Sequence, residues 1–249
     1  MRDKNIAFTI ATGRSLLSAQ LVIGEPVIAE HTFNLPRIYN NGVTIWDPSA
    51  QRLTLQHLLN STEVSTISNI AQARGITPFI NVIEPRNKHS IFHSEPQNQV
   101  EKELVHKYSS HAQAQLYLLT TLPINGQVTN ISMIGDNRPI NEIWLNLNRQ
   151  DNLIAYTGPA LEGSRYSWLD VHHKNANKGN AVLNLKIKLN ASNIICFGDG
   201  DNDLSMFKSS DESYAPENSI PEIKKAASKV IGNNNEDGVA HFLRERFAL

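Results

Sequence analysis

An apolar stretch that runs directly into a cluster of carboxylates constrains this chain more than any other feature. Asn193-Ile194-Ile195-Cys196-Phe197 is followed at once by Gly198-Asp199-Gly200-Asp201-Asn202-Asp203. The apolar run predicts a buried parallel strand, which would carry the acids to the C-terminal edge of a sheet, where open α/β folds bind ligands. Carboxylates this close repel one another unless a cation lies among them. The feature therefore predicts a hard divalent metal, Mg²⁺ above all, and chemistry on an anionic substrate.

Two other interpretations use the same residues. Asp199, Asp201 and Asp203 match the opening of an EF-hand calcium loop, which also needs glycine at its sixth position and glutamate at its twelfth. Those positions hold Leu204 and Ser210, so the calcium loop is excluded. An ordinary surface turn would explain the glycine and aspartate residues, but not the apolar strand that leads into them. The turn is the remaining alternative to a metal site.

The composition is typical of globular domains. The chain has 249 residues, 40% of them hydrophobic, and a net charge of −1, which suits one large or two modest domains and does not favour a nucleic-acid surface. The single cysteine, Cys196, lies in the predicted buried strand, where it would be a small core residue. No apolar stretch approaches the roughly 18 residues of a membrane span, and the N-terminus has no signal-peptide pattern. We therefore expect a cytoplasmic protein that binds neither membranes nor nucleic acid.

Hydrophobic periodicity predicts alternating strands and helices. The polar segment 2–5 is similar to the end of a helix, residues 6–11 predict a buried strand, and a helix should start near Ser15. Two short strands are expected about an Asn41-Gly42 turn within residues 37–47. Further strands are predicted at 79–83, 90–93, 116–120, 129–134, 153–156, 166–172, 193–197 and 229–231. Helices are predicted at 64–71 (N-cap Ser61 or Thr62, C-cap Gly75), 99–108, 141–147, 178–189, 204–207, 220–227 and from 237. This alternation predicts an α/β fold with a parallel, doubly wound sheet.

Three polar signals fall at strand ends or helix starts. Thr12-Gly13-Arg14 follows a predicted strand, where a hydroxyl and backbone N–H groups make an anion-binding corner; an ordinary helix cap is the alternative. Lys178 starts a helix, where its charge opposes the helix dipole. That position favours a phosphate partner, with a solvated surface lysine as the alternative. The acidic loop is the third signal.

Together and in this order, the signals resemble the motifs of the haloacid dehalogenase (HAD) superfamily, specifically its Cof-type phosphatase branch. The family's second motif is similar to Ile10-Ala11-Thr12-Gly13-Arg14-Ser15, its third to Lys178-Gly179-Asn180-Ala181, and its fourth to the acidic loop with Met206 following. The Asn41-Gly42 turn also matches, as does the tail Ala215-Pro216-Glu217-Asn218 through Glu222-Ile223-Lys224 to Glu236-Asp237-Gly238-Val239. The resemblance spans nearly the whole chain.

The resemblance implies a Rossmann-like core, residues 1–54 and 164–249, and an inserted α/β cap, residues 55–163, that closes over the active site and selects the substrate. It implies a Mg²⁺-dependent hydrolase of small phosphate monoesters, such as sugar phosphates or phosphorylated cofactors, that acts through an aspartyl-phosphate intermediate.

The same resemblance assigns roles to individual residues. Thr12 would bond the transferring phosphoryl group, and Lys178 would neutralise its charge. Asp199 would ligate Mg²⁺, and Asp203 would ligate it or orient it. The residues expected to bind phosphate or substrate beside these are Gly13, Arg14, Asn41, Asn202 and Asn218.

One departure from the family pattern bears on catalysis. The family's first motif, Asp-x-Asp-Gly-Thr, lies on the central strand before the Thr-Gly-Arg motif and supplies the nucleophile. Only eleven residues precede Thr12, and Asp3, the one acid among them, aligns with the end of the family's first helix. We expect no nucleophile in this chain, and a core that lacks its first strand and so has exposed backbone edges.

Two hypotheses follow. In the first, the chain begins at an internal methionine of a HAD phosphatase, which an in-frame Asp-x-Asp-Gly-Thr segment just upstream of Met1 would support. In the second, the chain is a complete, non-catalytic HAD-like protein that binds phosphate or metal or acts as a scaffold. In either case we expect little or no turnover by the 249-residue polypeptide.

Overall fold

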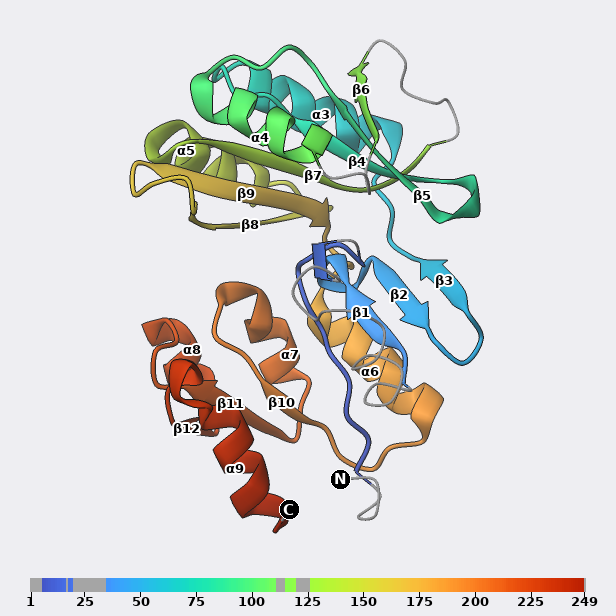
Figure 1. Ribbon diagram of the computed structural model, residues 1–249, viewed down its shortest axis with the longest axis vertical. Helices are drawn as coiled ribbons and strands as arrows, with labels where there is room; N and C mark the ends of the chain where they lie inside the picture. Colours follow the sequence, from blue (N-terminus) through green and yellow to red (C-terminus); the bar gives the residue numbers. More distant parts are fainter. Residues whose placement is uncertain (1–5, 17, 20–34, 111–114, 120–125, 249) are drawn as a thin grey trace. The chain divides into compact units, whose positions relative to one another are not determined.

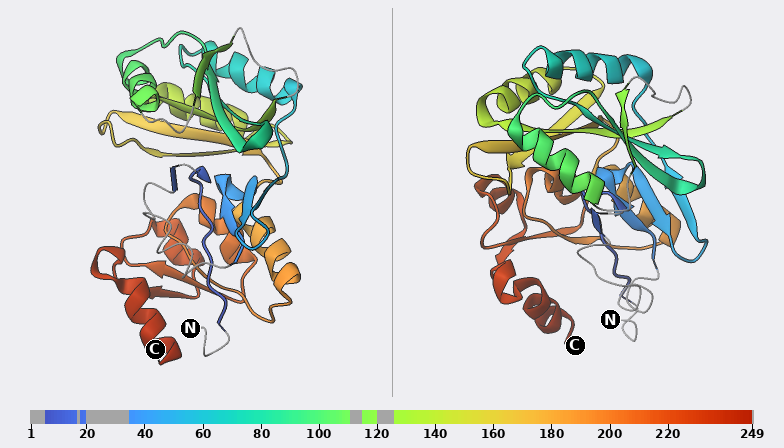
Figure 2. Two further views of the ribbon diagram at one scale, coloured as in Figure 1. Left: turned by 45° about the vertical axis from the view of Figure 1, so that its right-hand side comes forward. Right: turned by 45° about the horizontal axis from the view of Figure 1, so that its top comes forward.

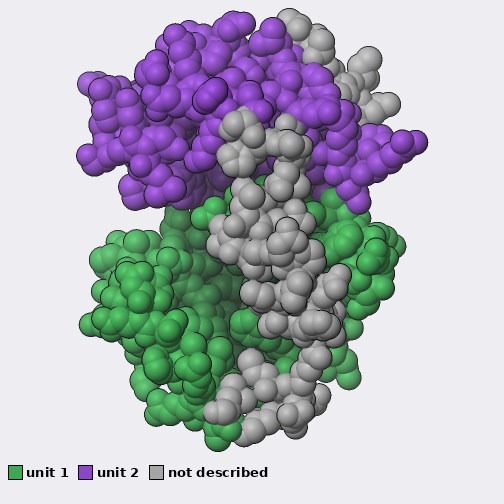
Figure 3. Space-filling model, in the orientation of Figure 1, with its two compact units in different colours: residues 1–54, 177–249 green, residues 55–176 purple. Residues whose placement is uncertain are grey.

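The computed structural model describes residues 6–16, 18–19, 35–110, 115–119 and 126–248. The chain divides into two compact units, coloured separately in Figure 3: unit 1 comprises Met1–Thr54 and Asn177–Leu249, and unit 2 comprises Leu55–Ala176. The helix end expected at 2–5 and part of the helix expected after Ser15 lie outside the described residues.

Unit 2 contains a six-stranded sheet with the order β6-β5-β4-β7-β9-β8 (Figure 1). The β5–β6 pair is parallel, and the other four pairs are antiparallel. The strands are β4 (Phe79–Glu84), β5 (Lys88–His93), β6 (Gln115–Leu118), β7 (Gln127–Asp136), β8 (Leu153–Pro159) and β9 (Tyr166–His173). The helices are α3 (Ser61–Gln72), α4 (Gln99–Ser110) and α5 (Asn137–Leu147). Short connections join β4 to β5 and β8 to β9, and such connections allow only antiparallel pairing.

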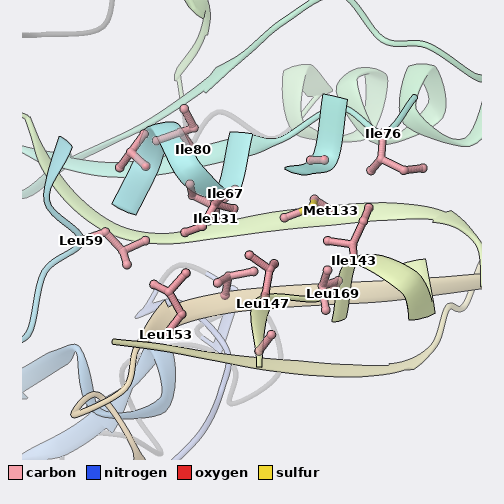
Figure 4. Packing of buried hydrophobic residues seen from close by; sticks show 14 of the residues in the cluster. Leu59, Ile67, Ile76, Ile80, Ile131, Met133, Ile143, Leu147, Leu153 and Leu169 are labelled. Atoms are coloured by element: carbon pink, nitrogen blue, oxygen red, sulfur yellow. The ribbon is translucent and has the colours of Figure 1, made fainter. Parts of the chain in front are cut away.

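The core of unit 2 lies between this sheet and helices α3 and α5. Ile80 of β4 packs in one cluster with Ile67 of α3 and Ile143 of α5, and all three side chains are almost fully buried (Figure 4). Because side chains alternate along a strand, Phe79 faces the other side of the sheet, where its ring lies 6.1 Å from that of Tyr108 in α4. Both faces of β4 are therefore covered.

In unit 1, the strands β1 (Arg37–Tyr39) and β2 (Thr44–Asp47) form the expected hairpin, and β3 (Arg52–Leu55) extends it. The turn, η2 (Asn40–Gly42), needs glycine at its end, because Gly42 has φ +104° and a Cβ there would lie 2.8 Å from the Asn177 carbonyl oxygen. Helix α6 (Lys178–Leu189) lies beside β1 (Figure 2), where Ile38 packs against Ala181 and Leu185.

The second sheet of unit 1 is parallel and has the order β10-β11-β12. Its strands are β10 (Ile195–Phe197), β11 (Glu212–Pro216) and β12 (Lys229–Ile231). The connections between them contain η5 (Asp201–Asp203), α7 (Leu204–Lys208) and α8 (Pro221–Ala226), and η6 (Asn234–Glu236) and α9 (Gly238–Phe247) follow β12. Parallel strands end at the same edge, so the segments that follow β10 and β11 meet: Ile220 N donates to Asp199 O at 3.3 Å.

The described residues do not form the continuous, doubly wound parallel sheet that the sequence predicted. Unit 1 has two separate three-stranded sheets, and unit 2 has a mixed one. Residues 6–10 form no strand, and Ala11 makes only an isolated parallel bridge with Ile38. Within the described residues, no strand pairs with the second edge of β10. The apolar run at residues 6–11 predicts burial, but a strand also needs a neighbouring strand to pair with. Within this run only Ala11, at its end, forms such a bridge.

Three further predictions differ from the structure. β9, which we assigned to the segment 164–249, pairs with β7 and β8, so unit 2 extends to Ala176 rather than ending at residue 163. The strands β3 and β11 were not predicted, because each is short and carries polar residues. The N-cap of α3 is Asn60, whose side chain and that of Glu63 bond each other's backbone N–H, and not Ser61 or Thr62.

Among the described residues, no helix combines the length and the apolar character needed to cross a bilayer.

Candidate active site

The acidic loop after β10 is organised around Asp203. This residue is 3% exposed, and its Oδ2 accepts hydrogen bonds from Asp199 N at 2.9 Å and Gly200 N at 3.2 Å. Gly198 allows the loop to close, because a Cβ there would lie 2.5 Å from the Asp203 Cβ and Cγ atoms. Asp203 thus acts as the N3 residue of a capping box at the start of η5, because its side chain accepts from the backbone N–H of the N-cap residue, Gly200.

The other oxygen of Asp203 holds Lys178. Lys178 Nζ lies 2.6 Å from Asp203 Oδ1, and both side chains are less than a tenth exposed. Lys178 is the first residue of α6, and the negative charge of Asp203 offsets the unfavourable position of a cation at a helix N-terminus. No described residue accepts the other two Nζ hydrogens, so the ammonium can still donate to an anion.

Close packing fixes α6 against the loop. Gly179 N donates to Ser205 Oγ at 3.1 Å, and a Cβ on Gly179 would lie 2.3 Å from the Ser205 carbonyl oxygen. Asn177 caps α6 by accepting from Asn180 N at 2.9 Å. We did not single out Ser205 or Asn177 from the sequence. Asn177 could have been found from its position one residue before the helix, whereas Ser205 is recognised only in the folded chain.

Thr12, Gly13 and Arg14 form a tight corner at the end of the segment that bridges to β1. Thr12 N donates to Ile38 O at 2.9 Å, and Thr12 Oγ1 accepts from Arg14 N at 3.1 Å. The Thr12 hydroxyl therefore keeps its hydrogen for another acceptor, because no described residue takes it. Arg14 is exposed, and its guanidinium bonds Ser18 Oγ at 3.3 Å.

Asn41 joins this corner to the acidic loop. Its backbone N donates to Thr12 O at 3.0 Å, and its Oδ1 accepts from Asn202 Nδ2 at 3.0 Å. A Cβ on Gly13 would lie 3.1 Å from each of these side-chain atoms, so the Gly13 backbone lies directly beside both amides. The second, third and fourth motifs of the sequence thus meet within unit 1.

Asp199 and Asp201 differ from Asp203 in their surroundings. Asp199 is exposed, and its carboxylate has no partner among the described residues. Burial raises the pKa of Asp201, because a charge there is poorly solvated. In this loop, therefore, the Asp203 carboxylate is bonded to the protein, the Asp201 carboxylate is partly desolvated, and the Asp199 carboxylate is available to bind a ligand.

The loop fits a divalent cation in a limited way. The described residues contain no cluster of three or more His, Cys, Asp or Glu side chains able to hold a metal. Three of the roughly four lone-pair positions of Asp203 are occupied, which leaves Asp199 as the carboxylate free to ligate. Mg²⁺ is commonly bound by one or two carboxylates, water and substrate phosphate, so a single free carboxylate suits it better than it suits a structural metal.

Asn218 lies beyond β11, and its amide is bonded to Asn234 in η6, the segment that follows β12. Its Nδ2 donates to Asn234 Oδ1 at 2.7 Å, and its Oδ1 accepts from Asn234 N at 3.1 Å. The structure therefore brings together Thr12, Gly13, Asn41, Asn202, Lys178 and Asp203, whereas it commits the Asn218 amide to Asn234.

Comparison with known proteins gives a consistent match. The family described as haloacid dehalogenase-like hydrolase matches residues 1–243. The chain is 46% identical over 56 residues to 5-amino-6-(5-phospho-D-ribitylamino)uracil phosphatase YitU of Bacillus subtilis, which covers 22% of this chain and 21% of that protein. It is 24% identical over 263 aligned positions to the B. subtilis phosphatase of the same description, YwtE, which covers 97% of this chain and 86% of that protein.

The fold is similar to solved structures. A haloacid dehalogenase-like hydrolase from Bacteroides thetaiotaomicron superimposes with a TM-score of 0.70 and 21% identity, covering 98% of this chain and 88% of that one. At this identity the likeness concerns the fold. Three other curated relatives align over only 44%, 29% and 30% of their own lengths, so the chain spans less than half of each.

Proposed function

This chain belongs to the haloacid dehalogenase-like hydrolase family, and from that premise we propose that its function is the Mg²⁺-dependent hydrolysis of small phosphate monoesters. The observation that carries the proposal is the buried Lys178–Asp203 pair, 2.6 Å apart, in the unit that also holds the Thr12 corner. A structural ion pair alone would not need a buried lysine whose other two Nζ hydrogens have no acceptor among the described residues.

We assign the phosphate-binding donors to three side chains. The Thr12 hydroxyl, the remaining hydrogens of Lys178 Nζ and the second Nδ2 hydrogen of Asn202 have no acceptor among the described residues. Phosphoryl transfer depends on such positioned donors, because charge spreads over the phosphoryl oxygens in the transition state. Arg14 is exposed at the same corner and would add a second positive charge.

The charges of these residues favour a metal-dependent site. Lys178 and Arg14 carry two positive charges, whereas Asp199, Asp201 and Asp203 carry up to three negative ones. A phosphate dianion would be repelled by that balance, and a divalent cation on Asp199 would reverse it. Bound there, Mg²⁺ would supply charge neutralisation for the phosphoryl group. Asp203 would act through the loop and Lys178.

Substrate and domain roles are part of the same proposal. We propose sugar phosphates and phosphorylated cofactors as the substrate class, which the names of YitU and YwtE support. We also propose that unit 1 is the core and unit 2 the cap that selects the substrate.

A second candidate function is binding of phosphate or metal without turnover. It is favoured by the sequence, in which no Asp-x-Asp-Gly-Thr segment occurs. The first candidate predicts turnover only by a polypeptide that also carries an Asp-x-Asp-Gly-Thr segment ahead of Met1, whereas the second predicts binding without turnover.

The test measures turnover and binding together. The 249-residue chain, alone and extended by an upstream Asp-x-Asp-Gly-Thr segment, is incubated with p-nitrophenyl phosphate and Mg²⁺, and inorganic phosphate binding is measured by calorimetry with and without Mg²⁺. Release of phosphate that Asp199→Asn abolishes supports the hydrolase and refutes pure binding. Mg²⁺-dependent phosphate binding without release supports the second candidate. Neither release nor binding would refute both.

A further inference from the structure

The bond between Asn41 and Asn202 links segments that are far apart in the sequence. The two residues are 161 positions apart, and Asn202 Nδ2 donates to Asn41 Oδ1 at 3.0 Å. Among the described residues, the two sheets of unit 1 share no strand pairing. Side-chain contacts must therefore set the position of the acidic loop relative to the Thr12 corner.

The backbone holds Asn41 in a conformation that suits few residue types. Its φ is +51°, the residue is 2% exposed, and its backbone N–H donates to Thr12 O. Asparagine and glycine adopt this left-handed conformation at little cost, whereas alanine does not. The asparagine side chain is thus delivered to Asn202 from a backbone that is itself anchored to the Thr12 corner.

We propose that Asn41 is a positioning residue, which aims the Asn202 amide at the phosphate site. This inference rests on the proposed function. The oxygen of Asn41 accepts from Asn202, and an amide oxygen cannot itself donate to a phosphate, so this end of the Asn41 side chain serves Asn202. Asn202 keeps its own Oδ1 and one Nδ2 hydrogen without a described partner. Fixing one amide hydrogen fixes the direction of the other, because the amide group is planar.

The choice of variants separates the side chain from the backbone. Asn41→Gly deletes the amide and tolerates the left-handed backbone, whereas Asn41→Asp keeps an acceptor of the same shape. Asn190, with φ +50° at the C-cap of α6, is exposed and has no contact with the site, so Asn190→Gly is a matched control for the backbone change.

Two measurements test the proposal. The Asn202 side-chain NH₂ signals in ¹⁵N–¹H spectra report the tether, and titration with inorganic phosphate in the presence of Mg²⁺ reports the consequence. We expect Asn41→Gly to move the Asn202 signals and to weaken phosphate binding by about 3- to 10-fold, the range of one neutral hydrogen bond. Asn41→Asp should restore the signals, and should restore the affinity at high salt, where its added charge is screened. Asn190→Gly should change neither.

A double-mutant cycle decides whether Asn41 acts through Asn202. In an Asn202→Ala background, Asn41→Gly should cause no further loss of phosphate affinity. An equal loss in both backgrounds, or unmoved Asn202 signals in Asn41→Gly, would overturn the proposal. If the unsubstituted chain binds no phosphate, the proposed function and the positioning role fail together, while the NH₂ signals still establish whether the tether exists.

Discussion

The buried pair of Lys178 and Asp203 allows the sharpest test of this structure. We compare Lys178→Met, Asp203→Asn and the double variant. Removal of one partner of a buried ion pair leaves an uncompensated charge, which destabilises proteins by about 3–5 kcal/mol. The two side chains are 7% and 5% exposed, so solvent offers little compensation.

The two single variants should not be equal. After Lys178→Met, the Asp203 carboxylate keeps the hydrogen bonds from Asp199 N and Gly200 N, so we expect a loss near 3 kcal/mol, the lower end of that range. After Asp203→Asn, Lys178 has no described partner, and the amide cannot accept from Lys178 and from both backbone groups with one oxygen. We expect a loss near 5 kcal/mol there.

The double variant measures the coupling. It buries no unpaired charge, so its loss should not exceed that of Asp203→Asn, and the coupling free energy should be about 3 kcal/mol. The assay is urea unfolding followed by hydrogen-exchange mass spectrometry, because peptides of unit 1 and unit 2 then report separately. Losses that add to within about 0.5 kcal/mol in unit 1 would refute the argument that the pair is buried and interdependent.

Three further predictions concern other parts of the chain. Burial lowers the pKa of His89 to about 4 from an ordinary 6.5, so folding favours its neutral form. The contribution of the neutral His89 to the free energy of unfolding is fully present above pH 6.5 and is lost as the pH falls towards 4. The loss is about 3 kcal/mol in total and should be absent in His89→Gln when urea unfolding is compared at pH 7 and pH 4. Gly179→Ala should destabilise unit 1 by about 1–3 kcal/mol despite the higher helix propensity of alanine, because its Cβ would clash with the Ser205 carbonyl; hydrogen exchange of unit 1 peptides checks this. Asn60→Ala should cost about 1 kcal/mol by breaking the capping box of α3, and a loss of amide protection confined to the first turn of α3 would confirm it.

Helix α3 of unit 2 and the β1–β2 hairpin of unit 1 were predictable because their signals are local. The helix α3 follows from apolar residues at helical spacing, and the hairpin of β1 and β2 follows from its Asn-Gly turn. Strand pairing is not predictable from such local signals, since it depends on which segments meet in the folded chain. Nothing in the residues of β9 indicates that its partners are β7 and β8 rather than a strand of unit 1, and the predicted domain boundary moved for that reason.

The candidate site shows the same division between residue types and contacts. Lys178, Asp199 and Asp203 could be selected because charged residues at a helix start or strand end need a reason to be there. The groups that these side chains contact could not be predicted from the sequence. Asn41 and Asn218 were both expected to bind phosphate, and their side-chain partners, Asn202 and Asn234, were not predicted. Side-chain partners 161 residues apart leave no signal in a single sequence.

The three aspartates of the acidic loop are chemically identical, and their surroundings give them different capacities. Asp203 is buried and bonded to Lys178 and two backbone groups, so its charge serves to hold the loop and the lysine. Burial raises the pKa of Asp201, because its charge is poorly solvated there. Asp199 alone is exposed and without a described partner. A cation that binds this loop must therefore compete with water at Asp199 rather than with Lys178 at Asp203. Cation binding should consequently depend on Asp199, and folding of unit 1 should depend on Asp203.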